Sequence, residues 1–113
     1  MNRVASYKIQ VMFLTVFAFL FFFIRLHAQT QSDAEKAYKT KCVACHAADG
    51  SGSEVGKKLG AHDFHSSQVQ SESDADLTQI IVKGKNKMPA YEKSLKPDEI
   101  KRLAAYVRDL AKK

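Results

Sequence analysis

The sequence predicts an all-α domain that follows an apolar N-terminal segment. The first observation is helical periodicity, because apolar side chains in residues 97–111 recur three and four positions apart. The second is a set of helix-start signals, in which Ser or Pro precedes acidic residues near positions 32, 73 and 97. The third is that no segment alternates convincingly between apolar and polar residues, as a half-buried strand would. We therefore expect helices connected by loops.

The first 28 residues have the layout of a secretory signal. Arg3 and Lys8 give a positive start, the 16 residues of Ile9–Ile24 are almost wholly apolar, and the segment closes at Ala28. Because a spanning helix usually needs about 20 residues, we predict a signal peptide over residues 1–28 that is cleaved after Ala28. An uncleaved membrane anchor is the alternative. Either interpretation places a single domain, residues 29–113, outside the cytoplasm.

The positive charge of the chain is concentrated in this N-terminal segment. Residues 1–28 contain three basic residues and no acidic ones, so the net charge falls from +6 for the whole chain to +3 for residues 29–113. So modest an excess gives no reason to predict a nucleic-acid partner. A domain of this length has a thin hydrophobic core and often depends on a metal, disulfides or another cross-link.

The first predicted helix follows a capping box. Ser32-Asp33-Ala34-Glu35 has the required spacing, with Ser32 as N-cap, and predicts a helix from Asp33 to about Cys42. Its buried face is marked by Ala34, Ala37 and Tyr38.

The remaining chain predicts a long loop and two further helices. Ala47–Ser73 is rich in Gly, Ser, Asp and His, and a loop of that length is unusual in a compact domain unless it is functional. Ser73 is the predicted N-cap of the second helix, which ends at Gly84, and Pro97 begins the third. The apolar faces of these two helices comprise Leu77, Ile80 and Ile81 in one, and Ile100, Leu103, Ala104, Val107, Leu110 and Ala111 in the other.

Cys42-Val43-Ala44-Cys45-His46 is a C-x-x-C-H motif, the attachment signature of a c-type haem. On a helical turn the two cysteines lie on one side, so both thiols can form thioethers with the vinyl groups of one porphyrin, and His46 can reach its iron. A disulfide, a thioredoxin-like motif or half a zinc site are the alternatives. The adjacent His46 and the later Met88-Pro89 argue against a disulfide. No βαβ pattern surrounds the motif, as a thioredoxin-like site would require, and there is no second cysteine pair for zinc.

Taken in order, these features of residues 32–113 resemble a class I c-type cytochrome, especially the small bacterial and photosynthetic single-haem carriers. The motif Gly84-Lys85-Asn86-Lys87-Met88-Pro89 follows the haem motif by some forty residues, and Leu103–Val107 lies in the last helix. The resemblance implies three main helices and long loops wrapped around one covalent haem c. It implies Cys42 and Cys45 as the attachment points, and His46 and Met88 as the iron ligands. It also implies that Ala34 and Tyr38 meet Leu103 and Tyr106.

One detail departs from the family pattern. Many members carry a proline in the loop after the haem motif, and its carbonyl holds the proximal histidine, whereas Val55–Gly60 contains no proline. The acceptor for the second nitrogen of His46 is therefore open. In the same loop, His62 and His65 are rivals of Met88 for the sixth coordination position, although each is more typical of a solvated surface histidine.

The resemblance implies an electron carrier rather than an enzyme, with no small-molecule substrate, because two axial ligands leave no open iron site. We expect electron transfer between membrane-associated redox complexes or other electron-transfer proteins, in the periplasm or at the outer face of the inner membrane. The alternatives are a haem-bearing relay subunit of a dehydrogenase or oxidase, and a gas- or peroxide-reactive haem protein. A basic cluster near Met88 is either solvated charge or a patch that steers an acidic partner; it comprises Lys83, Lys85, Lys87, Lys93 and Lys96.

Overall fold

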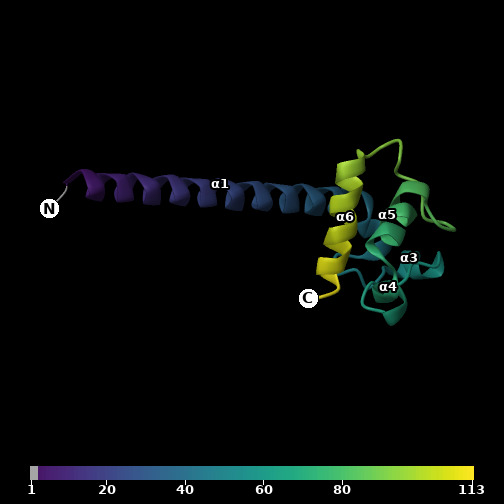
Figure 1. The fold of residues 1–113 in the computed structure, drawn as a ribbon. Helices are drawn as coiled ribbons and strands as arrows, with labels where there is room; N and C mark the ends of the chain where they lie inside the picture. Colours follow the sequence, from purple (N-terminus) through teal and green to yellow (C-terminus); the bar gives the residue numbers. More distant parts are fainter. Residues whose placement is uncertain (1–2) are drawn as a thin grey trace. The chain divides into compact units, whose positions relative to one another are not determined.

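The computed structural model describes the backbone of residues 3–113, and the side chains of residues 6–24, 31 and 33–113. The chain divides into two units, Met1–Thr30 and Gln31–Lys113. The helices are α1 (Arg3–Lys41), α2 (Val43–His46), α3 (Glu54–Lys58), α4 (Ser67–Ser71), α5 (Asp74–Lys83) and α6 (Pro97–Leu110) (Figure 1). Between residues 3 and 113 no β-strand forms, and the prediction of an all-α fold is confirmed.

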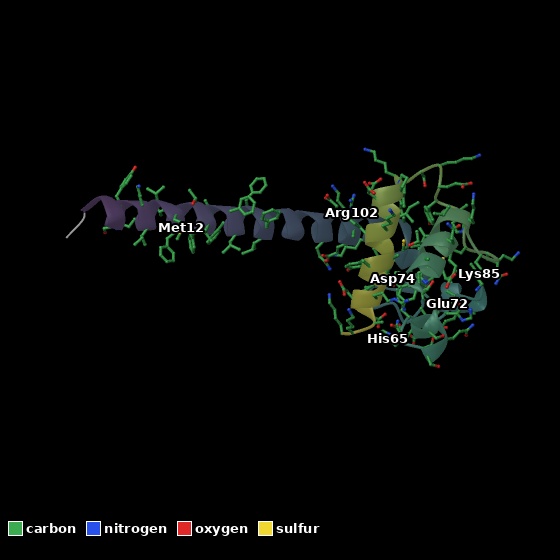
Figure 2. The ribbon with its side chains drawn as sticks, viewed as in Figure 1. Met12, His65, Glu72, Asp74, Lys85 and Arg102 are labelled. Atoms are coloured by element: carbon green, nitrogen blue, oxygen red, sulfur yellow. The ribbon has the colours of Figure 1, made fainter. Side chains whose placement is uncertain are left out.

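The first unit is the N-terminal part of α1, where Met12 is labelled in Figure 2. Within it, Ser6–Ile24 has a mean hydropathy of 2.0 and is long and apolar enough, by length and composition, to cross a membrane. None of this span is buried, and Phe13 and Phe17 are among its exposed aromatic side chains. A signal sequence and a membrane anchor share these properties.

The predicted start of the first helix at Ser32 is wrong. The backbone is helical on both sides of this residue, since α1 runs without a break from Arg3 to Lys41. The Ser32 side chain lies outside the described residues, and the predicted capping bonds lie there with it. The predicted end near Cys42 agrees with the end of α1 at Lys41.

The predicted starts of the other two main helices are confirmed. Ser73 caps α5, where its hydroxyl accepts from the Asp76 N–H at 3.1 Å and the Asp76 carboxylate accepts from the Ser73 N–H at 3.2 Å. Gly84 ends this helix with φ 73°. Pro97 occupies the first turn of α6, and the Glu99 carboxylate accepts from the Lys96 N–H at 2.8 Å. These bonds satisfy N–H groups that a helix start would otherwise leave unpaired.

The core of the second unit lies between the end of α1, α5 and α6, and α5 and α6 lie side by side (Figure 1). Tyr38 is its most buried large side chain, with 1% of its surface exposed. The rings of Tyr38 and Tyr106 have centroids 5.3 Å apart, so the predicted meeting of the first and last helices is confirmed for this pair. Ala34 and Leu103 belong to the same buried cluster.

The segment predicted as one irregular loop contains two short helices, α3 and α4. Ser53 and Ser66 cap them, each accepting from an N–H three residues later. Arg108 of α6 attaches the end of α4 to the domain. Its guanidinium donates to the carbonyls of Val69, Gln70 and Glu72, and pairs with the Asp74 carboxylate at 3.0 Å.

Candidate haem site

Cys45 and His46 lie on α2, a single helical turn, and Cys42 is the N-cap residue of this helix. The N–H groups of Cys45 and His46 both donate to the Cys42 carbonyl, at 3.1 and 2.9 Å. Both cysteines line an apolar cleft of the domain. Both are half-buried and free of any disulfide in the described chain. Burial raises the pKa of the Cys42 thiol to about 11. The pair therefore has the arrangement that two thioether attachments to one ring require.

The residue after the motif holds a strained backbone conformation. Ala47 has φ 60° and ψ 170°, a region adopted almost exclusively by glycine. Its carbonyl accepts a hydrogen bond from the Tyr38 hydroxyl at 2.7 Å, and its N–H donates to the Val43 carbonyl at 2.9 Å. The buried tyrosine thus fixes the point at which the chain leaves α2.

A close backbone contact joins α2 to α3. A Cβ added to Gly56 would lie 1.8 Å from the carbonyl oxygen of Cys45, so no side chain fits at this position. The Ser53 N–H donates to the same carbonyl at 2.9 Å, and the Ser53 hydroxyl donates to the Ala44 carbonyl at 2.7 Å. These contacts hold the loop that follows the haem motif directly against α2.

The imidazole of His46 is oriented by an aromatic ring. Phe64 stacks on it with centroids 4.8 Å apart and an interplanar angle of 27°. The Nδ1 atom of His46 is buried and has no hydrogen-bond partner among the described residues, so the acceptor left open by the missing proline is not supplied by Val55–Gly60. Burial lowers the pKa of His46, which favours the neutral imidazole that can ligate a metal.

Met88 is carried by a loop that two backbone contacts close. The Lys85 N–H donates to the Met88 carbonyl at 3.2 Å, and the Met88 N–H donates back to the Lys85 carbonyl at 2.9 Å. Asn86, between them, has φ 54°. Pro89 restricts the backbone of Met88 to extended conformations. Figure 2 shows Lys85 in this loop after α5.

One cleft brings these residues together. It encloses about 1340 Å³ of empty space, including its opening to solvent, and Cys42, Cys45, His46 and Met88 all line it. Its surface is mainly apolar. The apolar lining residues from the main helices and the loop before α6 are Leu77, Ile80, Ile81, Leu95, Leu103 and Val107. The donor set fits a haem: two thiols, one neutral imidazole and one thioether surround an apolar space.

Other ligand chemistries fit less well. No group of three or more His, Cys, Asp or Glu side chains that could hold a metal ion occurs in the described part of the chain. Of the two rival histidines, His62 lines the cleft but is exposed, whereas the His65 ring pairs with the Asp63 carboxylate at 2.7 Å.

The five lysines of the predicted basic cluster are all exposed, but they differ in their neighbours. Lys83 forms an ion pair with Glu92 at 2.6 Å, which offsets its charge. Lys85 and Lys87 line the cleft, and so does Lys41 at the end of α1.

Two contributions to the site did not follow from the sequence. Phe64 is the single Phe, Tyr or Trp between residues 47 and 73, and this isolation in a polar segment is a signal that could have identified it. Gly56 was one of several glycines in that segment, and nothing local distinguishes it from Gly60, where an added Cβ would meet nothing within 4 Å.

The helices, the cleft and the donor set define a c-type cytochrome. Comparison with known proteins agrees: a family profile described as "Cytochrome C oxidase, cbb3-type, subunit III" matches residues 29–107. Cytochrome c6 from a Nostoc species is 33% identical over 94 residues, covering 83% of this chain and 82% of that protein. Cytochrome c6 from Leptolyngbya boryana is also 33% identical, covering 69% of this chain and 89% of that protein.

A solved c-type cytochrome structure has the same fold. Its TM-score is 0.65 at 32% sequence identity, and the match covers 68% of this chain and 95% of the other. The chain therefore belongs to the class I c-type cytochromes. Family membership implies one covalently bound haem c with its iron, a role as an electron carrier, and electron-transfer proteins as partners.

Proposed function

We propose that the protein carries electrons between redox partners outside the cytoplasm, with Cys42 and Cys45 as the haem attachment points and His46 and Met88 as the axial ligands. The observation that carries this proposal is the cleft, which gathers four residues from two distant segments around one apolar space. When bound, the haem iron supplies one-electron redox chemistry between its ferric and ferrous states.

Each proposed site residue has a distinct task. Cys42 and Cys45 would hold the cofactor, each by adding its sulfur and hydrogen across one vinyl group, which involves no net oxidation. His46 and Met88 would both ligate the iron, which would leave no iron site for a substrate. A soft thioether ligand and an apolar cleft both disfavour the extra positive charge of the oxidised state, and both therefore raise the reduction potential.

The test compares the wild-type protein, exported together with a haem-maturation system, with two variants. A pyridine haemochrome assay on the denatured chain detects the covalent haem, and the ferric near-infrared band reports sulfur–iron ligation. We expect Met88→Leu to lose this band and to bind carbon monoxide when reduced, whereas His62→Ala keeps the band. A band that persists in Met88→Leu, or that disappears in His62→Ala, would refute Met88 as the ligand.

We also propose that the lysines beside the cleft steer acidic partners. Lys85 and Lys87 are exposed and line the cleft, which places positive charge beside the proposed cofactor. The probe is ferricyanide, an anionic oxidant, mixed with the reduced protein over a range of salt concentrations. Long-range attraction predicts a rate that falls as salt rises. The double variant Lys85→Gln/Lys87→Gln should flatten this dependence more than Lys101→Gln on α6, and equal effects would contradict the proposal.

The N-terminal segment is proposed to be a signal peptide, residues 1–28, that directs the domain to the periplasm. The apolar span Ser6–Ile24 supports this, as do the basic residues Arg3 and Lys8 near its start. Intact-mass measurement of the exported protein should give a chain that begins at Gln29. A full-length mass together with membrane association would instead support an anchor.

The profile named for an oxidase subunit favours one second candidate, a relay subunit of a larger complex. Gentle extraction followed by size-exclusion chromatography distinguishes the two roles. A free carrier elutes at the size of this chain alone, whereas a relay subunit co-elutes with larger proteins.

A further inference from the structure

The two segments that carry the proposed haem site are joined by a side-chain hydrogen bond. The Tyr91 hydroxyl donates to the backbone carbonyl of Lys41 at 3.0 Å, across fifty residues of sequence. Among the hydrogen bonds of the described residues, it is the one that connects residues 41–47 with residues 84–92. Lys41 directly precedes Cys42, and Tyr91 follows Met88 by three residues.

Both ends of this bond are held in place. The Tyr91 N–H donates to the Ile81 carbonyl of α5 at 3.0 Å, and the Tyr91 carbonyl accepts from the Ser94 and Leu95 N–H groups, each at 3.0 Å. The tyrosine ring is half-buried and lines the cleft. The acceptor lies in the last turn of α1, where a helix leaves carbonyls without partners inside the helix.

The backbone hydrogen bonds that join the Met88 loop to a helix all lead to a single element. At one end the Gly84 N–H donates to the Ile80 carbonyl. At the other end the Tyr91 and Glu92 N–H groups donate to the Ile81 and Val82 carbonyls, so all three backbone hydrogen bonds are to α5. A loop whose backbone hydrogen bonds all lead to one helix can move relative to the rest of the domain without breaking these bonds. The Tyr91 hydroxyl adds an attachment on the opposite side of the cleft, next to the cysteine motif.

We propose that Tyr91 is a positioning residue whose hydroxyl holds the Met88 loop against the chain that precedes Cys42. This proposal rests on the proposed function, in which Met88 ligates the iron. This hydrogen bond between Tyr91 and Lys41, called the tie below, keeps the loop closed over the cleft. It therefore favours the Met-bound state over an open state in which another ligand reaches the iron. Since a net hydrogen bond shifts an equilibrium roughly 3- to 10-fold, its removal should raise the open fraction by that factor.

The test is imidazole binding to the ferric holoprotein, followed by loss of the near-infrared sulfur–iron band. Tyr91→Phe removes the hydroxyl and keeps the ring. Because imidazole binds only the open state, its apparent affinity should rise roughly 3- to 10-fold in this variant. Tyr106→Phe is the matched control, because it removes a hydroxyl from a core tyrosine that does not line the cleft. Urea unfolding of both variants measures any general loss of stability.

The possible results separate the two proposals. A higher imidazole affinity in Tyr91→Phe, with Tyr106→Phe like the wild type, supports the tie. An unchanged affinity in Tyr91→Phe, or an equal rise in both variants, overturns it and leaves Met88 ligation intact. A wild-type holoprotein without the near-infrared band overturns Met88 ligation itself, and the tie with it.

Discussion

Gly84 holds the start of the Met88 loop in a backbone conformation that other residues rarely adopt. Its φ of 73° and ψ of 172° fall in a region used almost exclusively by glycine, at a cost of about 1–3 kcal/mol for any other residue. A Cβ would also lie 2.4 Å from the Met88 carbonyl oxygen and 2.9 Å from the Ala90 nitrogen. These are backbone atoms, so the loop itself must move, and such crowding costs about 1–3 kcal/mol.

We therefore expect Gly84→Ala to lower the free energy of unfolding by about 1–5 kcal/mol, after an offset of about 0.4–1 kcal/mol from the stiffer unfolded chain. Denaturant unfolding of the ferric holoprotein measures the loss, and the sulfur–iron band reports whether Met88 is displaced. Gly60→Ala is the control, since Gly60 also has a positive φ, 87°, but open space around it. Gly60→Ala should lose stability through backbone strain alone and should keep the sulfur–iron band. If Gly84→Ala were no less stable than Gly60→Ala and kept a normal band, the steric reasoning would be refuted.

Three further changes test the local structure. Ala47→Gly should stabilise the protein by about 1 kcal/mol, because relief of backbone strain exceeds the extra entropy of the unfolded chain; a lower denaturation midpoint would contradict this. Ser73→Ala should destabilise it at neutral pH. Hydrogen bonds from Ser73 lower the pKa of Asp76, so their stabilisation is present above the ordinary carboxyl pKa of about 3.9 and is lost as the pH falls through the lower folded value. The difference in stability between the variant and the wild type should therefore shrink as the pH falls below the ordinary carboxyl pKa, and a constant difference would argue against this. Arg108→Met should cost about 2 kcal/mol and speed amide exchange chiefly in residues 69–72, whose carbonyls lose a charged donor; uniform acceleration would count against that local role.

The helix starts that the sequence predicted correctly are those whose signals act locally. At Ser73 and Pro97 the capping bonds or the fixed φ involve residues at most three positions away. The same kind of signal failed at Ser32, because a capping box does not reveal that the preceding residues also continue a helix. The helices α3 and α4 were missed because five residues are too few to show a periodic apolar face. Helices so short owe their stability to packing rather than to propensity.

The contacts of the candidate site also fall into local ones, which the sequence predicted, and long-range ones, which it did not. The C-x-x-C-H motif places its three side chains by the geometry of one turn, so the sequence alone was enough to predict their grouping. The close approach of Gly56 to the Cys45 carbonyl, the stacking of Phe64 on His46 and the Tyr91 bond to Lys41 each join segments that are distant in sequence. No spacing rule predicts such contacts, because they depend on how the loops cross once the helices have packed.

The core and the cleft share their side chains, and this has a consequence for folding. Leu77, Ile81 and Leu103 are at most 8% exposed and belong to the hydrophobic core, yet they also line the cleft. A domain of this size buries too little apolar surface to be very stable by itself. The apolar lining of the cleft therefore continues the protein core. A covalently attached haem ring would bury this lining and so complete the core. The proposed ligands His46 and Met88 line this same apolar surface, so we expect folding and haem attachment to be coupled in this protein.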